Sequence, residues 1–442
     1  MSQGHRGNRV CLDADPPTRR PVPFRREVVY MIPITRKGAV VASASLALCL
    51  GAAACSSSSS SSTPSGGSSS SASSSSSSGT TVSISVAAFD RTFAAMAALK
   101  PLASAGKGNV AVILPDTVTS ARYVQFDAPY LTQALTAAGL SSSQFTVQNA
   151  QGSDQTELSD AQTAITKGAT VLIMDPLDSG VGAQIETYAK SHGVAVIDYD
   201  RLTLGGSRQY YVSFNNVVVG QKIGAGFTAC ATAWHVAKPN VLVMKGDPTD
   251  NNATLFAQGY LGVLNPLFSS GKYVKVGEPA GTWTPSVALS EFQQNFTAHK
   301  NINSVLTPND ANAAPIIHYL QTQGVKAKTF PVTGQDATTI GLQNILAGYQ
   351  CGTVYKPIYL EAQAAAALAM FLRAGKTPPT ALVNGSANDS KSNTPVPSVL
   401  LTPKWVTTAN MASTVVADKF VVVGQLCVGQ YAQLCKTAGI SL

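Results

Sequence analysis

The feature that most constrains the fold is a regular alternation of short apolar runs with helix-length amphipathic stretches between residues 107 and 356. Uninterrupted apolar runs predict strands buried on both faces, as in parallel sheets that are covered by helices. About ten such strands are too many for one sheet, so we expect two α/β lobes. The expected strands are residues 109–114, 144–149, 170–175, 194–198, 210–213, 240–244, 273–277, 304–306, 330–333 and 353–355.

Helical patterns fill the intervals between these runs. Parallel α/β folds bind their ligands at the carboxyl ends of the strands, where the connecting loops converge, so we expect the functional site there. The expected helices are residues 87–99, 128–138, 157–167, 182–192, 217–237, 253–267, 287–299, 313–323 and 338–347.

Residues 31–54 have the order of an export signal. Arg36 and Lys37 form a basic region, residues 38–50 form a short apolar run, and residues 52–54 are three alanines. Small residues at this position are what signal peptidases require. We therefore expect this segment to be a signal peptide.

Cys55 follows these alanines directly, and small residues before a cysteine resemble the bacterial lipobox, in which the cysteine is lipidated. Ala52 is a departure, because the lipobox usually has leucine there. Residues 55–79 are otherwise almost entirely Ser, Gly and Thr, a composition that predicts a flexible tether with a reach of roughly 25–30 Å. We expect a lipoprotein that begins at Met31, with residues 1–30 an extension upstream of the start. An ordinary signal peptide with an incidental cysteine is the alternative.

The formal net charge of +8 is concentrated in the leader. Eight of the 31 basic residues and three of the 23 acidic residues lie in residues 1–55, which leaves 23 basic and 20 acidic residues in the body. A nearly balanced body argues against nucleic acid as the partner.

Cysteine usage agrees with export. The body keeps Cys230, Cys351, Cys427 and Cys435, which allow two disulfides in an oxidising compartment. Cys427 and Cys435 are close in sequence, which would leave Cys230 to pair with Cys351; four buried free thiols are the alternative. There is no C-x-x-C motif, so no zinc site is expected.

The expected strand ends carry carboxylates, amides, cations and aromatic rings. This mixture suits a neutral sugar, because each hydroxyl both donates and accepts and an apolar sugar face can lie on an aromatic ring. Hydrogen bonds to charged groups contribute roughly 1.5–3 kcal/mol each, so a few of them with one stacking contact suffice for micromolar binding. These groups are Asp116, Arg122, Tyr123, Asp200, Arg201, residues 245–252, Trp283, Asn309, Asp310, residues 334–336 and Lys356.

Each of these groups has a structural alternative when it is taken alone. Asp200 and Arg201 would make a surface ion pair. Residues 250–252 would cap the helix that follows. Trp283 would be a core residue.

Together, these positions resemble the D-xylose-binding proteins of ABC sugar importers, within the type I periplasmic sugar-binding fold. The matching segments keep their order and spacing from about residue 108 to residue 420. Each segment is a weak signal alone, and the set is highly specific. The segments are residues 198–201, 211–216, 247–256, 309–311, 334–337, 347–348, 353–358 and 396–403.

The resemblance implies a sugar-binding set with no catalytic residue, no metal and no cofactor. Trp283 would be the stacking ring. Tyr123 departs from the family, which usually has tryptophan there, and this leaves the identity of the sugar open. The implied ligands of the sugar are Arg122, Tyr123, Asp200, Arg201, Asn252, Trp283, Asn309, Asp336 and Lys356.

The resemblance also implies an α/β fold with two Rossmann-like lobes and a hinge of three chain crossings. The first lobe would comprise residues 107–214 and 357–395, and the second would comprise residues 215–356 and 396–442. The crossings would lie near residues 214–215, 355–356 and 396–401.

The implied function is an extracytoplasmic substrate-binding lipoprotein, anchored to the outer face of the cell membrane by lipid. It would capture a monosaccharide, with D-xylose favoured, by closing its lobes. It would then deliver the sugar to an ABC permease that works with a cytoplasmic ATPase. We expect a monomer.

Three other functions remain open from the sequence. A glycoside hydrolase would use two carboxylates such as Asp200 and Asp336, but their cationic and amide neighbours favour permanently ionised acceptors. A sugar-responsive transcription regulator would need a DNA-binding module within residues 1–106, where we find only a leader, a tether and one helical stretch. A binding protein for ribose, arabinose or galactose is the third, although the calcium loop of many galactose binders is absent from the sequence.

Overall fold

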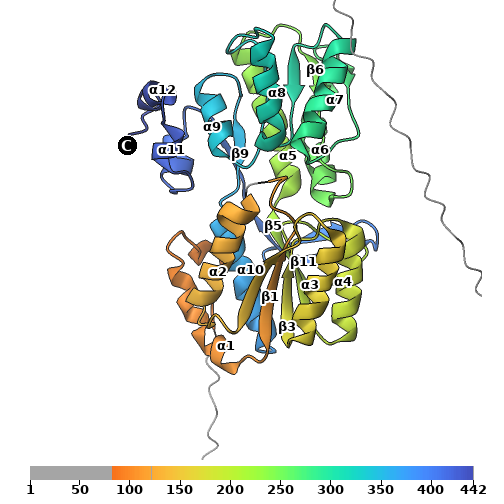
Figure 1. The fold of residues 1–442 in the computed structure, drawn as a ribbon, viewed down its shortest axis with the longest axis vertical. Helices are drawn as coiled ribbons and strands as arrows, with labels where there is room; N and C mark the ends of the chain where they lie inside the picture. The colour runs from red at the N-terminus through yellow and green to blue at the C-terminus, as the bar shows by residue number, and fades with distance from the viewer. Residues whose placement is uncertain (1–81, 121, 442) are drawn as a thin grey trace, which may run out of the picture. The chain divides into compact units, whose positions relative to one another are not determined.

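The computed structural model describes residues 82–120 and 122–441. These residues form two α/β lobes with mostly parallel sheets, as the sequence predicts (Figure 1). The expected signal peptide, Cys55 and the tether lie outside the described residues. No helix in the described part of the chain is long and apolar enough to cross a membrane.

The first lobe is built on a seven-stranded sheet in the order β10-β11-β5-β4-β3-β1-β2. Neighbouring strands run parallel, except that β10 is antiparallel to β11. The strands are β1 (Asn109–Leu114), β2 (Phe145–Asn149), β3 (Ala169–Met174), β4 (Ala195–Tyr199), β5 (Tyr210–Phe214), β10 (Gly385–Asp389) and β11 (Thr394–Leu401).

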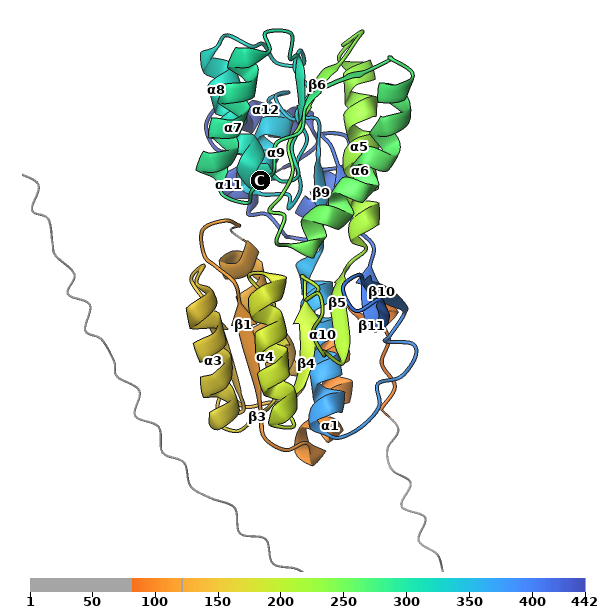
Figure 2. The same ribbon diagram turned by 90° about the vertical axis from the view of Figure 1, so that its right-hand side faces the viewer.

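Helices cover both faces of this sheet. They are η1 (Val86–Ala88), η2 (Ala94–Leu99), α1 (Lys100–Ala105), the π-helix η3 (Tyr123–Asp127), α2 (Ala128–Ala137), α3 (Asp154–Thr166), α4 (Ser179–Ser191) and α10 (Ile358–Arg373). Side chains alternate across a strand, so Val110 and Val112 of β1 pack with α2 and α10, while Ala111 and Ile113 pack with α3 and α4. Figure 2 shows α3 and α4 on one side of the sheet and α1 and α10 on the other.

The second lobe has a three-stranded parallel sheet, β7-β6-β8, and an antiparallel pair, β12-β9. Its strands are β6 (Asn240–Val243), β7 (Val274–Gly277), β8 (Ser304–Leu306), β9 (Thr353–Tyr355) and β12 (Lys404–Val406). Its helices are α5 (Asn216–Ala233), α6 (Asn251–Ser269), α7 (Pro285–Ala298), α8 (Asp310–Thr322), α9 (Thr339–Leu346), η4 (Ala412–Val416), α11 (Val423–Leu426) and α12 (Tyr431–Thr437).

Two glycines bring α5 and α6 into backbone contact. A Cβ atom on Gly220 would lie 2.1 Å from the carbonyl oxygen of Phe256, and one on Gly259 would lie 2.2 Å from the carbonyl oxygen of Val217. Only glycine fits where two backbones approach so closely. Because α5 follows β5 directly, this contact fixes the first turn of α6 close to the first lobe.

The chain passes between the two sheets at three places within the described residues. These are the junctions from β5 to α5, from β9 to α10 and from β11 to β12. The third crossing corrects the expected boundary at residue 396, because β11 pairs with β5 through Leu401. The start at residue 107 also shifts, since Met96 and Leu99 are buried in the core of the first lobe with α10.

Two further expectations about single elements were wrong or incomplete. Residues 330–333 do not form a strand; Val332 makes an isolated bridge to Val305. Pro331 has no N–H for a ladder, and the side chain of Thr333 accepts from the Thr307 N–H at 3.0 Å instead. Helix α10 was not expected, because it is buried on nearly all sides and lacks the separate polar face of an amphipathic helix.

The structure contains two disulfides in the second lobe. Cys230 on α5 is bonded to Cys351, which precedes β9, and Cys427 is bonded to Cys435. These are the two pairings considered from the sequence, and the first closes a loop with a sequence separation of 121.

Candidate functional site

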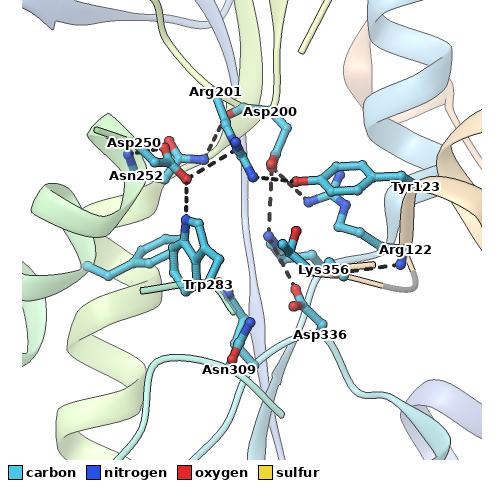
Figure 3. Close-up of a pocket in the computed structure, with 14 residues that line it drawn as sticks. Arg122, Tyr123, Asp200, Arg201, Asp250, Asn252, Trp283, Asn309, Asp336 and Lys356 are labelled. Carbon is cyan, nitrogen blue, oxygen red and sulfur yellow. Dashed lines mark hydrogen bonds and ion pairs between the residues drawn. The ribbon is translucent and has the colours of Figure 1, made fainter. Parts of the chain in front are cut away.

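A pocket lies where the carboxyl ends of strands from both sheets meet (Figure 3). The non-atom space within it, open solvent included, is about 350 Å³. All nine sugar-binding residues expected from the sequence line it. The full lining is Thr119, Ser120, Arg122, Tyr123, Asp200, Arg201, Asp250, Asn252, Phe256, Trp283, Asn309, Gln335, Asp336 and Lys356.

Arg122 is held by three buried carboxylates of the first lobe. Its Nη1 donates to Asp200 Oδ1 at 2.7 Å, and its Nη2 donates to Asp127 Oδ1 at 2.7 Å and to Glu361 Oε2 at 2.9 Å. Burial raises the pKa of Glu361 to about 8, with Arg122 acting in the opposite direction. Arg122 therefore acts chiefly by fixing Asp200 at the pocket wall.

Asp200 is the carboxylate best prepared to stay ionised. Burial alone would raise its pKa, but the cations Arg122 and Lys356 outweigh burial and lower that pKa to about 2. Its backbone φ of +57° lies in the left-handed region, which non-glycine residues rarely adopt and which marks stored strain. The sequence allowed an ion pair between Asp200 and Arg201. The structure shows Asp200 paired with Arg122 and Lys356 instead.

Arg201 instead crosses the cleft. Its Nε lies 3.2 Å from Asp250 Oδ2 of the second lobe, and its Nη2 donates to the Tyr123 hydroxyl oxygen at 3.0 Å. Its Nη1 donates to the carbonyl oxygen of Leu177 at 2.9 Å. Arg201 is thus held by protein partners from both lobes and forms a fixed wall of the pocket, although its Nε makes no hydrogen bond within the described residues.

Asn252 makes a second link between the lobes. Its Nδ2 donates to the backbone carbonyl oxygen of Asp200 at 3.0 Å, and its Oδ1 accepts from Asn216 Nδ2 at 2.7 Å. Asn216 is the first residue of α5, beside the first chain crossing. The hinge and the pocket are therefore joined by one chain of hydrogen bonds.

Two aromatic rings contribute to the pocket walls. Trp283 is oriented by a hydrogen bond from its Nε1 to Asp250 Oδ2 at 3.0 Å, and its ring meets Phe256 edge-on with centroids 6.4 Å apart. Tyr123 lies beneath two guanidinium groups, those of Arg122 and Arg201, at 5.6 and 5.9 Å from its centroid. Trp283 is thus a pocket wall and not solely a core residue.

Several polar groups in the pocket lack hydrogen-bond partners. Lys356 Nζ lies between two carboxylates, 3.4 Å from Asp336 Oδ1 and 3.7 Å from Asp200 Oδ1 (Figure 3). Both Asp336 Oδ1 and Gln335 Oε1 are buried without a hydrogen bond in the described structure. Buried polar groups are rarely left unpaired, so these atoms indicate where a polar ligand binds.

Five lining residues are absent from the sugar-binding set that the resemblance implies. Asp250 stands among the strand-end groups and as a candidate helix cap; it does accept from the Asn252 N–H at 2.8 Å, and its other oxygen accepts from Trp283 Nε1. Phe256 follows Asn252 by four positions on α6, a spacing that places both on one helix face. Thr119, Ser120 and Gln335 flank expected residues in the same loops, and no separate signal marks them.

The chain matches known proteins over most of its body. Residues 110–377 match the family described as "Periplasmic binding protein domain". The "D-xylose-binding periplasmic protein" of Escherichia coli (strain K12) is 38% identical over 278 residues, which cover 62% of this chain and 80% of that protein. The "Multiple sugar-binding periplasmic receptor ChvE" of Rhizobium radiobacter is 30% identical over 341 residues, or 74% of this chain and 94% of that one.

A solved structure shares the fold. The carbohydrate transporter solute-binding protein of Chloroflexus aurantiacus, solved in complex with D-glucose, is 26% identical with a TM-score of 0.63; the match covers 72% of this chain and 97% of that one. The two-lobed fold, the inter-lobe pocket and these matches agree. The chain belongs to the periplasmic binding protein family.

Proposed function

We propose that this protein is the extracytoplasmic binding component of an ABC sugar importer and that it encloses one uncharged monosaccharide between its lobes. The observation that carries the proposal is the pocket itself. Polar and aromatic side chains from both lobes converge on one pocket, where Asp336 Oδ1 and Gln335 Oε1 make no hydrogen bond within the described part of the chain.

The charges of the pocket favour a neutral ligand. Three cations, Arg122, Arg201 and Lys356, face three carboxylates, Asp200, Asp250 and Asp336. A ligand with net charge would leave one sign in excess in a buried site, which is costly. Hydroxyl groups satisfy both signs, because each can donate to a carboxylate and accept from an ammonium or guanidinium group.

D-xylose is the sugar that we favour. Two relatives named for D-xylose binding, at 38% and 36% identity, support this choice. Other relatives are named for multiple sugars, and a structural neighbour holds D-glucose. Tyr123 affects the choice of sugar, because its hydroxyl oxygen already accepts a hydrogen bond from Arg201 Nη2. That N–H group is therefore not available to a sugar hydroxyl.

A binding role explains the carboxylates better than hydrolysis does. A glycosidase needs one protonated carboxylic acid at the scissile bond. Asp200 is ionised at all physiological pH values, because nearby cations override the effect of burial and lower its pKa to about 2, and Asp336 lies beside Lys356. Both therefore act as hydrogen-bond acceptors.

Delivery follows from closure and anchoring. Sugar contacts from both lobes favour the closed form, which would dock on a membrane permease driven by a cytoplasmic ATPase. The lipid on Cys55 would hold a monomer at the outer face of the membrane. Replacing Cys55 with Ser is expected to release the protein into the soluble fraction, and persistence in the membrane would contradict the anchor.

Calorimetry with a panel of pentoses and hexoses tests the main proposal. We expect a Kd in the micromolar range or tighter for D-xylose, and weaker binding of hexoses with their additional hydroxymethyl group. Tight binding of a hexose, without binding of D-xylose, would replace D-xylose as the assigned ligand. Absence of binding to every sugar, or steady turnover of aryl xylosides, would overturn the binding function.

A further inference from the structure

The turn that carries Gln335 and Asp336 has a strained backbone. Asp336 has a φ of +88° and Ala337 a φ of +49°. Two consecutive non-glycine residues in the left-handed region cost free energy. Such a turn persists only where the surrounding structure holds it, so some group must keep Asp336 in place.

We propose that Asp310 is a positioning residue for sugar binding, because it clamps both ends of the strained turn that presents Asp336 to the pocket. Its own N–H donates to the carbonyl oxygen of Gln335 at 3.0 Å, before the strained pair. Its Oδ2 accepts from the Thr338 N–H at 2.8 Å and from Thr338 Oγ1 at 3.1 Å, after the pair.

The carboxylate of Asp310 is fully committed to this task. Its Oδ1 accepts from Gln350 Nε2 at 2.7 Å. The Asp310 carboxylate is therefore the acceptor in all three of these hydrogen bonds. Asp310 is 0% exposed and does not line the pocket. It therefore acts on the ligand only through the turn.

The space around Asp310 is shaped for that carboxylate. A Cβ atom on Gly334 would lie 2.0 Å from Asp310 Oδ1, and one on Gly341 would lie 2.2 Å from Oδ2. The two glycines thus let the turn and the start of α9 close over the carboxylate. Two other contacts hold the turn, from the Asp336 N–H to the Val354 carbonyl oxygen at 2.8 Å and from the Ala337 N–H to Thr353 Oγ1 at 3.1 Å.

Replacing Asp310 with Asn keeps the shape but reverses one hydrogen bond. The new amide group would direct its N–H groups either at Thr338, which donates, or at Gln350 Nε2, which also donates. In the first orientation the end of the clamp at Thr338 is lost, and the strained pair is free to relax. Asp336 Oδ1 would then leave its place 3.4 Å from Lys356 Nζ. In the second, the carboxylate's support from Gln350 is lost instead, and the backbone bond to Gln335 remains in both.

The inference rests on the proposed function, and calorimetry with the sugar that the wild type binds is its test. We expect Asp310→Asn to weaken binding at least about tenfold, equivalent to about 1.4 kcal/mol. Asp389→Asn is the matched control. Asp389 is also 0% exposed and accepts from backbone N–H groups, but it lies in the first lobe away from the pocket. It should lower the melting temperature and leave the affinity within about twofold.

A second-site change separates positioning from general support. Glycine tolerates positive φ without strain, so adding Ala337→Gly to Asp310→Asn should recover at least about threefold of the lost affinity. Unchanged affinity in Asp310→Asn, equal loss in Asp389→Asn, or no recovery with Ala337→Gly would each overturn the inference.

Two further measurements keep the test decisive. If Asp310→Asn does not fold, Gln350→Met removes the donor to Oδ1 and should weaken binding about threefold; an unchanged affinity would overturn the inference. A crystal structure of unliganded Asp310→Asn is expected to show Asp336 at negative φ, and retention of positive φ would contradict the clamp. That structure needs no sugar, so failure of the clamp is distinguishable from a wild type that binds no sugar.

Discussion

The side-chain Nδ2 of Asn252 donates to the main-chain carbonyl oxygen of Asp200 at 3.0 Å, across the junction of the two lobes. The same carbonyl oxygen accepts from Tyr211 Oη at 2.9 Å and from Ser213 Oγ at 2.8 Å. Asp200 is thereby fixed through its backbone by both lobes, while its carboxylate stays available at the pocket wall. A movement of one lobe relative to the other would therefore also disturb the position of Asp200 in the pocket.

Asn252→Ala is expected to weaken closure as well as sugar binding. The variant loses the donor to the Asp200 carbonyl oxygen and the acceptor for Asn216 Nδ2. We expect the affinity to fall about tenfold, and small-angle X-ray scattering to report a larger radius of gyration without sugar. Gln258→Ala, at an exposed position of the same helix, is the control, and equal effects in both variants would refute a specific link.

Trp283→Ala and Asp336→Ala are each expected to weaken sugar binding tenfold or more, about 1.4 kcal/mol. Trp283 offers a ring face, and Asp336 offers an acceptor, Oδ1, that makes no hydrogen bond in the described structure. Calorimetry measures both losses. Trp405→Phe, which changes a tryptophan outside the pocket, serves as control, and unchanged affinity in both site variants would discard the assignment of these residues.

Much of the architecture is readable from the sequence, because buried parallel strands are uninterrupted apolar runs with helices between them. The parts that were missed lack those local signals. Strand β11 contains Pro395 and Pro397, which normally argue against a strand inside a sheet, and its place beside β5 is set by pairing. Helix α10 is buried all around, so it shows no amphipathic period.

The lining of the pocket was predictable to a similar extent. The nine expected residues follow strands in order, and the resemblance to sugar-binding proteins supplied their roles. Their partners were not predictable, since Glu361 reaches Arg122 across 239 positions and only the fold brings them together. The strain at Asp336 and Ala337 is equally invisible in the sequence, because aspartate adopts positive φ only occasionally and alanine rarely does.

The stability of the protein is expected to fall as pH rises from about 5 to about 8. Burial raises the pKa of Glu157 from 4.5 to about 8, so in this window the folded state binds a proton that the unfolded state has released. Stability therefore decreases with rising pH. Glu157→Gln keeps an acceptor for the Leu177 N–H and should make the slope of the unfolding free energy less steep, as urea titrations at several pH values would measure.

The control for this pH effect is Glu278→Gln. Burial would raise the pKa of Glu278, but Lys275 and Lys245 outweigh burial and lower that pKa. The contribution of Glu278 to the unfolding free energy therefore changes only below pH 4.5. Its slope between pH 5 and 8 should match that of the wild type. A slope in Glu157→Gln that equals the wild-type slope would show that Glu157 titrates normally in the folded protein.

The two disulfides should differ in their contribution to stability by about twofold. A cross-link stabilises by restricting the unfolded chain, more so for a longer loop. The sequence separation is 121 for Cys230–Cys351 and 8 for Cys427–Cys435, which corresponds to about 5 and about 2.5 kcal/mol in the chain-entropy treatment. Denaturant titration of the two double-alanine variants measures both losses. An equal loss, or a larger loss from Cys427→Ala/Cys435→Ala, would mean that native contacts of the C-terminal segment outweigh loop entropy.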